Sequence, residues 1–398
     1  MKKQNHSATA RYALVQGLYW AVYCLMVGFA SAFLLDRGFT NTQIGLILGL
    51  SYLFSALLQP VVGAVFSRIR MPLNHAVACT YLPVAAASLC VLVLPLGMIP
   101  LAVLMVLMFT IQSMMQPSVN ALHQTLRTEK ETVNFGLARG VGSAAYALSS
   151  FVMGRLLTRF APSILPGAYG LAVAALILVL FLVHTNQSEG KASILSRNIS
   201  YASILRNHPH MALFLAGIAC MFLTYSFIDS FLLQIILNVG GASADLGTAI
   251  TLSAVTELPA MILFAHLSRK GLGLKLFMIS IWCWLAKDIL TLLAPSPLTL
   301  YGVQLLNFFS CAVYVPGMMV YMQHTLPESQ LLRGVTLAGT STTLGSLAAT
   351  VLGGWLIDTL GMHSALLTVQ FFAGAGAVLL TLALLHAMKT PPPREGEA

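Results

Sequence analysis

The sequence contains very few charged residues. Only 8% of its 398 residues are Asp, Glu, Lys or Arg, whereas soluble globular proteins carry roughly 25%. Hydrophobic residues make up 58% of the chain, and its mean hydropathy is +0.84. A soluble domain of this size could not bury so much apolar surface beneath a charged exterior. The composition therefore excludes an ordinary soluble enzyme, a disordered protein and most nucleic-acid-binding proteins.

Motifs of hydrolysis and metal binding are also missing. The chain has no HExxH, GxSxG or Walker A pattern, and no CxxC pair. All six cysteines fall within apolar runs, which indicates small core side chains and neither a disulfide framework nor a metal site. No histidine lies near the middle of such a run, which argues against a histidine proton relay. We therefore expect no enzyme activity, no metal and no cofactor. The cysteines are Cys24, Cys79, Cys90, Cys220, Cys283 and Cys311.

Long apolar runs are what the sequence has in abundance. A bilayer core about 30 Å thick is crossed by about 20 helical residues. Twelve runs of roughly this length lie between polar or Gly/Pro breaks, so we predict an all-α integral membrane protein with twelve transmembrane helices. The runs are 12–35, 44–66, 73–94, 99–122, 135–157, 163–184, 211–237, 246–266, 274–294, 298–322, 335–357 and 364–386.

Basic residues are distributed unevenly between the loops. Of the 21 Lys and Arg residues, only Arg37, Arg155 and Arg159 fall on one side of the predicted membrane, and Arg139 and Lys287 lie inside runs. All others fall on the opposite side. Because cytoplasmic loops carry the excess of Lys and Arg, we expect a multi-pass protein with both termini in the cytoplasm. This bias explains the net charge of +9 without a nucleic-acid partner.

An internal repeat divides the chain. Arg139-Gly140-Val141 recurs as Arg333-Gly334-Val335. Gly45, followed five residues later by Leu-Ser, recurs at a similar offset as Gly247, again followed five residues later by Leu-Ser. A duplicated six-helix unit requires such a shared offset. The longest polar stretch lies between the two halves. We predict an N-terminal bundle at 1–184, a cytoplasmic central loop at 185–210, and a C-terminal bundle with a short cytoplasmic tail at 211–398.

Polar side chains recur at helical spacing on several runs. Such side chains are costly in lipid and are expected to face the bundle interior or water. They would either form hydrogen bonds between helices or line a central wet cavity. Their presence on four runs in both halves favours a cavity that binds a polar solute. The candidate binding residues from these stripes are Gln116, Asn120, Arg139, Tyr146, Gln304, Asn307 and Tyr23.

Arg139 lies inside a run of the first half. Four further ionisable residues lie inside runs of the second half: Asp229, Glu257, Lys287 and Asp288. A carboxylate within the membrane is a functional-site hypothesis by default. Glu257 is the first candidate for proton coupling and Asp229 the second, with Lys287 as their counter-charge. The alternative is that Lys287 pairs with one of them only to fix helix packing, and that Arg139 extends to the membrane interface.

Several segments resemble a known transporter family. The segments 134–139 and 142–148 resemble the fifth helix of lactose permease and its oligosaccharide/proton symporter relatives, and 57–63 resembles their second helix. Glu257-Leu258-Pro259 resembles the eighth helix of the phenylpropionate-type permeases. The resemblance implies the major facilitator fold, with two pseudo-symmetric six-helix bundles around a site that opens alternately to each side. By the same analogy we expect a monomer in a bacterial cytoplasmic (inner) membrane.

The resemblance also implies residue roles. It places Arg139 and Glu257 on the family's sugar-hydroxyl ligands and Tyr146 on the aromatic residue that stacks on the sugar. Lys287 falls on a ninth-helix arginine, and Asp229 on a seventh-helix aspartate. The family's usual proton site is absent, because Asn307 and Ser310 replace its tenth-helix histidine and glutamate. Asn120 likewise replaces the glutamate partner of the arginine.

These patterns predict a secondary active transporter that imports a small polar solute, a sugar or a glycoside, together with protons. Loss of the usual proton site leaves a uniporter as one alternative. An importer of an aromatic acid or a nucleoside is another, with Arg139 or Lys287 meeting an anionic group. A membrane sensor that binds solute without moving it is an alternative of a different class; we expect short cytoplasmic tails without an appended domain, which counts against a signalling role.

Overall fold

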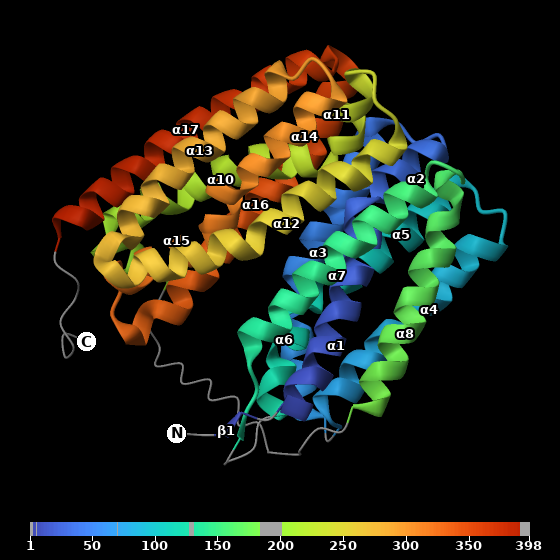
Figure 1. The fold of residues 1–398 in the computed structure, drawn as a ribbon, viewed down its shortest axis with the longest axis horizontal. Helices are drawn as coiled ribbons and strands as arrows, with labels where there is room; N and C mark the ends of the chain where they lie inside the picture. Colours follow the sequence, from blue (N-terminus) through green and yellow to red (C-terminus); the bar gives the residue numbers. More distant parts are fainter. Residues whose placement is uncertain (1–2, 5, 70, 127–130, 184–200, 391–398) are drawn as a thin grey trace. The chain divides into compact units, whose positions relative to one another are not determined.

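The computed structural model describes residues 3–4, 6–69, 71–126, 131–183 and 201–390, and it is almost entirely helical (Figure 1). Two-residue strands β1 (Lys3–Gln4) and β2 (Glu131–Thr132) form a small parallel ladder that the sequence did not predict. The chain separates into two compact units. Unit 1 comprises Met1–Ser193 and Ser243–Ala254, and unit 2 comprises Ile194–Ala242 and Val255–Ala398.

Unit 1 is built from helices that correspond to the first six predicted runs. Its first run bends at a π-helical turn, where α1 meets α2 at 41°. A capping box between Thr40 and Gln43 begins the third helix, because each side chain binds the other residue's backbone N–H. The elements are α1 (His6–Tyr23), η1 (Cys24–Gly28), α2 (Ala30–Asp36), α3 (Asn41–Arg68), α4 (Leu73–Val93), α5 (Met98–Met114), α6 (Gln116–Thr125), α7 (Phe135–Leu156), η2 (Pro162–Ile164) and α8 (Leu165–Leu182).

Unit 2 contains the remaining helices. A short helix, α9 (Tyr201–Asn207), lies within the stretch predicted as a loop at 185–210; residues 185–200 of that stretch are outside the described residues. Gly361, with φ of 80°, provides the one-residue turn between the last two helices. The elements are α9 (Tyr201–Asn207), α10 (Pro209–Ser230), α11 (Leu232–Asn238), α12 (Ser243–Leu267, shared with unit 1), η3 (Ser268–Leu272), α13 (Gly273–Leu293), α14 (Pro297–Leu305), η4 (Leu306–Phe309), α15 (Cys311–Thr325), α16 (Glu328–Leu360) and α17 (Met362–Lys389).

The helix pairing is repeated in the two units. In unit 1, α1 packs along α7, and α4 packs along α8; in unit 2, α10 packs along α16, and α13 along α17. The first long helix of each unit, α1 and α10, is followed by a break at a phenylalanine, Phe29 in unit 1 and Phe231 in unit 2. The number of residues between these two phenylalanines equals that between Gly45 and Gly247. These correspondences support the predicted internal duplication. The domain boundaries proposed from the sequence remain a prediction.

Glycines allow the paired helices to approach closely. A Cβ atom at Gly345 of α16 would collide with the backbone carbonyl oxygen of Ala219 on α10. At the corresponding crossing in unit 1, a Cβ at Gly142 of α7 would lie 2.6 Å from the Trp20 ring on α1. Small residues at helix crossings are typical of membrane proteins, in which van der Waals packing drives helix association.

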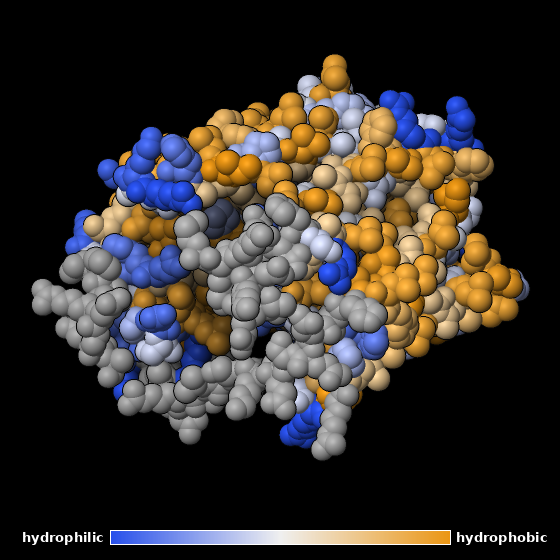
Figure 2. Space-filling view, turned by 60° about the horizontal axis from the view of Figure 1, so that its bottom comes forward, coloured by the Kyte–Doolittle hydropathy of each residue, from blue (hydrophilic) through white to orange (hydrophobic). Residues whose placement is uncertain are grey.

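The outer flanks of the helices are apolar. Ile99, Leu171 and Phe371 are each at least 75% exposed, and hydrophobic residues cover much of the face drawn in Figure 2. In the described residues, nine helices are long and apolar enough to cross a membrane, or ten when the bent first pair is one span. The continuous stretch Ser243–Leu293 counts once although it holds both α12 and α13. Helix α7 is not among the nine, since Arg139, Arg155 and many small residues lower its hydropathy.

Candidate functional site

A chain of polar contacts runs along one face of α1 in unit 1. Gln16, fully buried, donates through Nε2 to the Tyr12 hydroxyl at 2.6 Å and to Asn120 Oδ1 at 3.2 Å. Its other amide atom, Oε1, accepts from Trp20 Nε1 at 3.0 Å. Gln16 thus fixes both the Trp20 indole and the predicted site residue Asn120. The i, i+4 spacing of residues 12, 16 and 20 places all three on the same face of the helix.

Arg139 of α7 reaches the end of this polar chain. Its guanidinium carbon lies 3.9 Å from the centroid of the Trp20 ring, a cation–π contact, and its Nη1 donates to Ser143 Oγ at 2.8 Å. Arg139 is half-buried and turned toward α1 within the unit. The structure thus places it against Trp20 and does not show the extended orientation considered from its sequence position.

Aromatic rings surround the Arg139 contact. Trp20 lies 5.1 Å from Tyr23 and 6.3 Å from Tyr146, measured between ring centroids. Both tyrosines are half-buried, as is Gln116 at the start of α6. Unit 1 therefore brings together Arg139, Tyr146, Tyr23 and Asn120, four of the five candidate binding residues from the first half. We call Gln16, Trp20, Tyr23, Asn120, Arg139, Ser143 and Tyr146 the unit 1 cluster.

Unit 2 gathers its ionisable groups around Cys311 at the start of α15. The charges of Lys287, Glu257 and Asp229 all act on the Cys311 side chain, which also forms a hydrogen bond with Tyr225. Lys287 is buried, Glu257 is half-buried and Asp229 is exposed. A carboxylate within a membrane-spanning helix is expected to face the bundle interior or a polar cavity. The three predicted proton-coupling residues therefore lie close together in unit 2, and we call them with Cys311 and Tyr225 the unit 2 cluster.

An aromatic group borders the unit 2 cluster. Trp284 packs edge-on against Phe222 and Tyr225, each at 5.6 Å between centroids, and Tyr314 lies 4.8 Å from Phe222. The indole Nε1 of Trp284 is buried without a hydrogen-bond partner among the described residues. Gln304 and Asn307, candidate binding residues from the tenth run, are also buried. They line the interior of unit 2 and are less accessible than Asp229.

Part of each polar stripe serves helix packing. Gln112 is buried and accepts from the hydroxyls of Tyr81, at 3.1 Å, and Tyr19, at 3.2 Å through its backbone oxygen. Ser150 of α7 and Thr251 of α12 share a hydrogen bond of 2.7 Å. Hydrogen bonding between helices, one of the two interpretations of the stripes, therefore accounts for Gln112 and Ser150.

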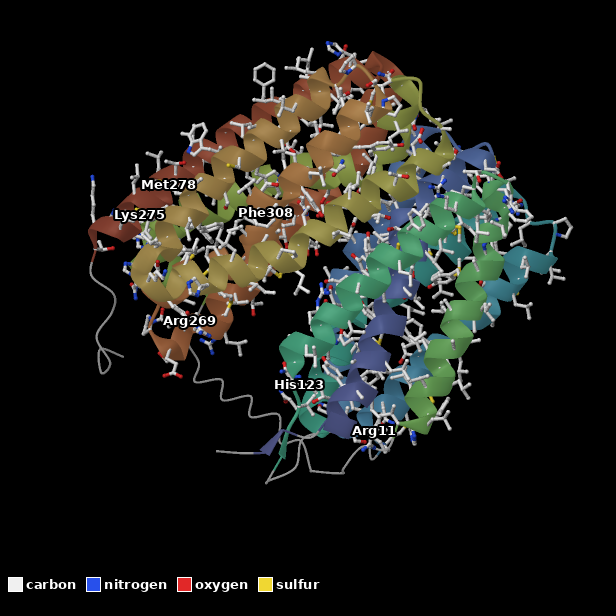
Figure 3. The ribbon with its side chains drawn as sticks, viewed as in Figure 1. Arg11, His123, Arg269, Lys275, Met278 and Phe308 are labelled. Carbon is white, nitrogen blue, oxygen red and sulfur yellow. The ribbon has the colours of Figure 1, made fainter. Side chains whose placement is uncertain are left out.

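Basic and histidine side chains lie at helix ends. Arg11 and His123 lie at one end of unit 1, and Arg269 and Lys275 at one end of unit 2 (Figure 3). Burial lowers the pKa of His208, which immediately precedes α10. Among the described residues, no group of three or more His, Cys, Asp or Glu side chains is arranged to hold a metal ion.

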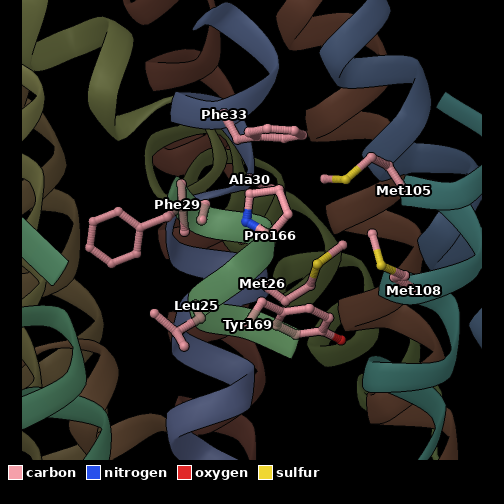
Figure 4. Close-up of a pocket in the computed structure, with 10 residues that line it drawn as sticks. Leu25, Met26, Phe29, Ala30, Phe33, Met105, Met108, Pro166 and Tyr169 are labelled. Atoms are coloured by element: carbon pink, nitrogen blue, oxygen red, sulfur yellow. The ribbon is translucent and has the colours of Figure 1, made fainter. Parts of the chain in front are cut away.

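An apolar pocket lies in unit 1 beside the π-helical turn (Figure 4). It contains no charged side chain, so it does not suit the polar solute predicted from the stripes. Its walls are Leu25, Met26, Phe29, Ala30, Phe33, Met105, Met108, Leu165, Pro166 and Tyr169.

The fold defines a class of transporter. The structure aligns with two crystal structures of the nucleoside transporter NupG, one of them a mutant, with TM-scores of 0.78 and 0.76 at 14% identity, covering 96% of this chain and 99% of each NupG chain. It also aligns with a bacterial homologue of the human lysosomal transporter Spinster, with a TM-score of 0.70 at 13% identity, covering 97% of this chain and 98% of that chain. These likenesses show the major facilitator fold.

The family assignment follows from the sequence. The MFS_1 like family matches residues 10–368, and the chain belongs to this family. It is therefore a multi-pass membrane protein and a secondary transporter for a small molecule, not an enzyme. The uncharacterized transporter YwbF of Bacillus subtilis (strain 168) is 23% identical over 398 residues, which cover 97% of this chain and 96% of YwbF.

Sequence reasoning missed two residues of these clusters, Trp20 and Tyr225, and the Trp284 that borders the unit 2 cluster. Trp20 lies on the same helical face as Gln16 and Tyr23, so its spacing was a usable signal. Trp284 and Tyr225 carried no comparable signal, because single aromatic residues in apolar runs are most often core residues. Their position beside Cys311 depends on how α10, α13 and α15 pack together.

Proposed function

We propose that this protein imports a small hydroxyl-rich solute, a sugar or a glycoside, together with protons, as a monomer in a bacterial cytoplasmic membrane. The unit 1 cluster is the observation that carries the proposal. Its amides, hydroxyls and guanidinium supply several donors, and its aromatic rings supply an apolar face; sugar rings need both. The resemblance to the oligosaccharide/proton symporters supports the same substrate class.

Proton coupling is assigned to unit 2. Glu257, half-buried beside Lys287, Asp229 and Cys311, is the first candidate to load a proton on one side of the membrane and release it on the other. Lys287 supplies a fixed positive charge that favours release. Asp229 is the second candidate. With Asn307 and Ser310 at the family's usual positions, a proton path through these two carboxylates is what distinguishes symport from uniport.

A nucleoside is the second candidate substrate. The aromatic group around Trp284, with an indole N–H that has no partner among the described residues, suits a planar heteroaromatic base. The nucleoside transporter NupG shares the fold. A nucleoside is itself a glycoside, so the donors of the unit 1 cluster that suit a sugar would also suit its sugar ring.

The test is uptake of labelled sugars and nucleosides into inverted or right-side-out vesicles of known orientation, with and without an inward proton gradient. We expect a sugar to accumulate against its gradient, and Glu257→Gln to abolish accumulation while leaving downhill exchange. Equilibration that ignores the proton gradient would establish a uniporter. Accumulation of a nucleoside but of no simple sugar would select the second candidate. Purified protein that moves no solute in liposomes would contradict transport and favour a sensor.

A further inference from the structure

Asp288 is a buried carboxyl group that the proposed proton path does not use. It lies on α13, next in sequence to Lys287, and only 2% of its surface is exposed. Helix α13 packs against α15 and α17 in this part of unit 2. The peptide backbone here is held by Gln370 of α17, whose Nε2 donates to the backbone oxygen of Asp288 at 3.1 Å.

The hydrogen bonds around Asp288 lack one donor. Asp288 Oδ2 and Gln370 Oε1 are both buried and have no hydrogen-bond partner among the described residues. Exchanging the Gln370 amide nitrogen and oxygen would not supply the missing donor, because Gln370 Oε1 would then face the backbone carbonyl oxygen of Asp288. Both unpartnered atoms accept hydrogen bonds when the carboxyl is ionised. A single proton on Asp288 supplies a donor to this pair.

The charges in unit 2 also favour a protonated, neutral Asp288. Lys287, 5% exposed, acts on both Asp229 and Asp288, and Glu257 belongs to the same cluster. One ammonium group cannot balance all of these carboxylates. The Asp229 side chain has accessible surface in unit 2, whereas the Asp288 side chain has almost none. Among the described residues of the elements packed against α13, the other basic groups lie near helix ends: Arg269 and Lys270 in η3, Lys275 at the start of α13, and His210, His324, His363, His386 and Lys389 toward the ends of α10, α15 and α17. The remaining titratable groups on these elements are Cys220, Tyr225, Asp229, Cys283, Tyr301, Cys311, Tyr314 and Tyr321. A buried, unbalanced carboxylate costs several kcal/mol, and such groups become neutral instead.

We propose that Asp288 is a proton-binding site that takes part in coupling. In the structure described here it is the neutral acid, and its hydroxyl donates to Gln370 Oε1, so that the charge of Lys287 is left to Asp229. Release of this proton requires Lys287 to turn from Asp229 to Asp288. The coupling role rests on the proton symport proposed above, whereas occupancy of the site by a proton does not.

Infrared difference spectroscopy of the purified full-length protein in lipid tests the occupancy. The wild type is expected to show the carbonyl band of a protonated carboxyl, shifted in D2O, at pH 7. Asp288→Asn should lose this band, and Asp229→Asn should keep it. Gln370→Leu should keep the band at a shifted frequency, since the acid has lost its acceptor. A band unchanged in Asp288→Asn would overturn the proposal.

Transport measurements test the coupling role. Asn is isosteric with the neutral acid and supplies an N–H donor, so Asp288→Asn should fold; its thermal unfolding in detergent verifies this. With the panel solute that the wild type accumulates, Asp288→Asn should lower gradient-driven accumulation at least tenfold and retain counterflow. Unchanged accumulation would overturn the coupling role. If the wild type transports no solute, the proposed function fails, and the infrared result still decides whether Asp288 holds a proton.

Discussion

Arg139 combines two contacts that a lysine could not reproduce. Its planar guanidinium stacks on Trp20 and donates to Ser143, and the same fork presents further donors for substrate hydroxyls. We predict that Arg139→Lys raises the KM for the transported solute roughly 10- to 100-fold, because a charge-assisted hydrogen bond contributes about 1.5–3 kcal/mol. Initial rates of uptake over a range of solute concentrations measure the change.

Arg155 provides the matched control on the same helix. It also lies over an aromatic ring, at 5.2 Å from the centroid of Phe151, but it is exposed in the last turn of α7. Arg155→Lys should leave the KM within about twofold of the wild type, because a surface contact of this kind contributes little. An equal loss in both variants would mean that any α7 arginine is needed for folding and that Arg139 has no special role in binding.

The sequence could predict individual site residues only where helical spacing or a motif marked them. Arg139, Asn120 and Tyr23 stood out because polar groups are rare in apolar runs, and the structure places them together in unit 1. The pairing of Gln16 with both Trp20 and Asn120 could not be predicted, since it depends on the crossing of α1 with α6 and α7. The same holds for Gln370 and Asp288, which are distant in sequence and meet only through the packing of α13 on α17.

At the scale of helices, the crossing of α10 with α16 depends on Gly345. We predict that Gly345→Ala lowers the free energy of unfolding by about 1–3 kcal/mol, because the new methyl group meets the Ala219 carbonyl oxygen and other α10 backbone atoms that cannot move independently. Gly339→Ala on the same helix is the control, since no atom lies within 4 Å of its added Cβ. It should be neutral or stabilising by up to about 1 kcal/mol.

Thermal unfolding in a defined detergent, followed by tryptophan fluorescence, measures both variants. Similar destabilisation by the two substitutions would contradict a specific role for the Gly345 crossing.

The extent of α16 illustrates a limit of the sequence patterns at this scale. Hydropathy predicted residues 335–357, whereas the helix runs from Glu328 to Leu360, because helical hydrogen bonds continue into polar segments that hydropathy excludes.

At the scale of the whole chain, α12 belongs to both compact units. Its first part, Ser243–Ala254, is assigned to unit 1, and the rest to unit 2. In unit 1 it is held against α7 by the Ser150–Thr251 hydrogen bond of 2.7 Å and by the close approach of Gly154 to Gly247. Because α12 continues into unit 2, a movement of that unit during transport would pull on this helix, so we expect its contact with α7 inside unit 1 to open during transport.

A disulfide between these positions tests the expectation. In a Ser150→Cys/Thr251→Cys double variant, oxidation should stop transport, and reduction should restore it, because the cross-link holds α12 on α7. Each single variant under the same oxidant is the control, which also accounts for the six native cysteines. Full transport by protein shown to be cross-linked would mean that this contact persists throughout the cycle.

The repeated helix pairing has an evolutionary consequence. Two copies of one structural unit begin with identical chemistry, yet here Asp229, Lys287, Asp288 and Glu257 all lie within helices of unit 2. Their counterpart in unit 1 is Arg139, on α7. After duplication, either copy is free to lose what the other still provides. On the function proposed above, the two halves have divided the labour: one descendant of an ancestral half kept groups suited to holding the solute, and the other kept those suited to handling charge.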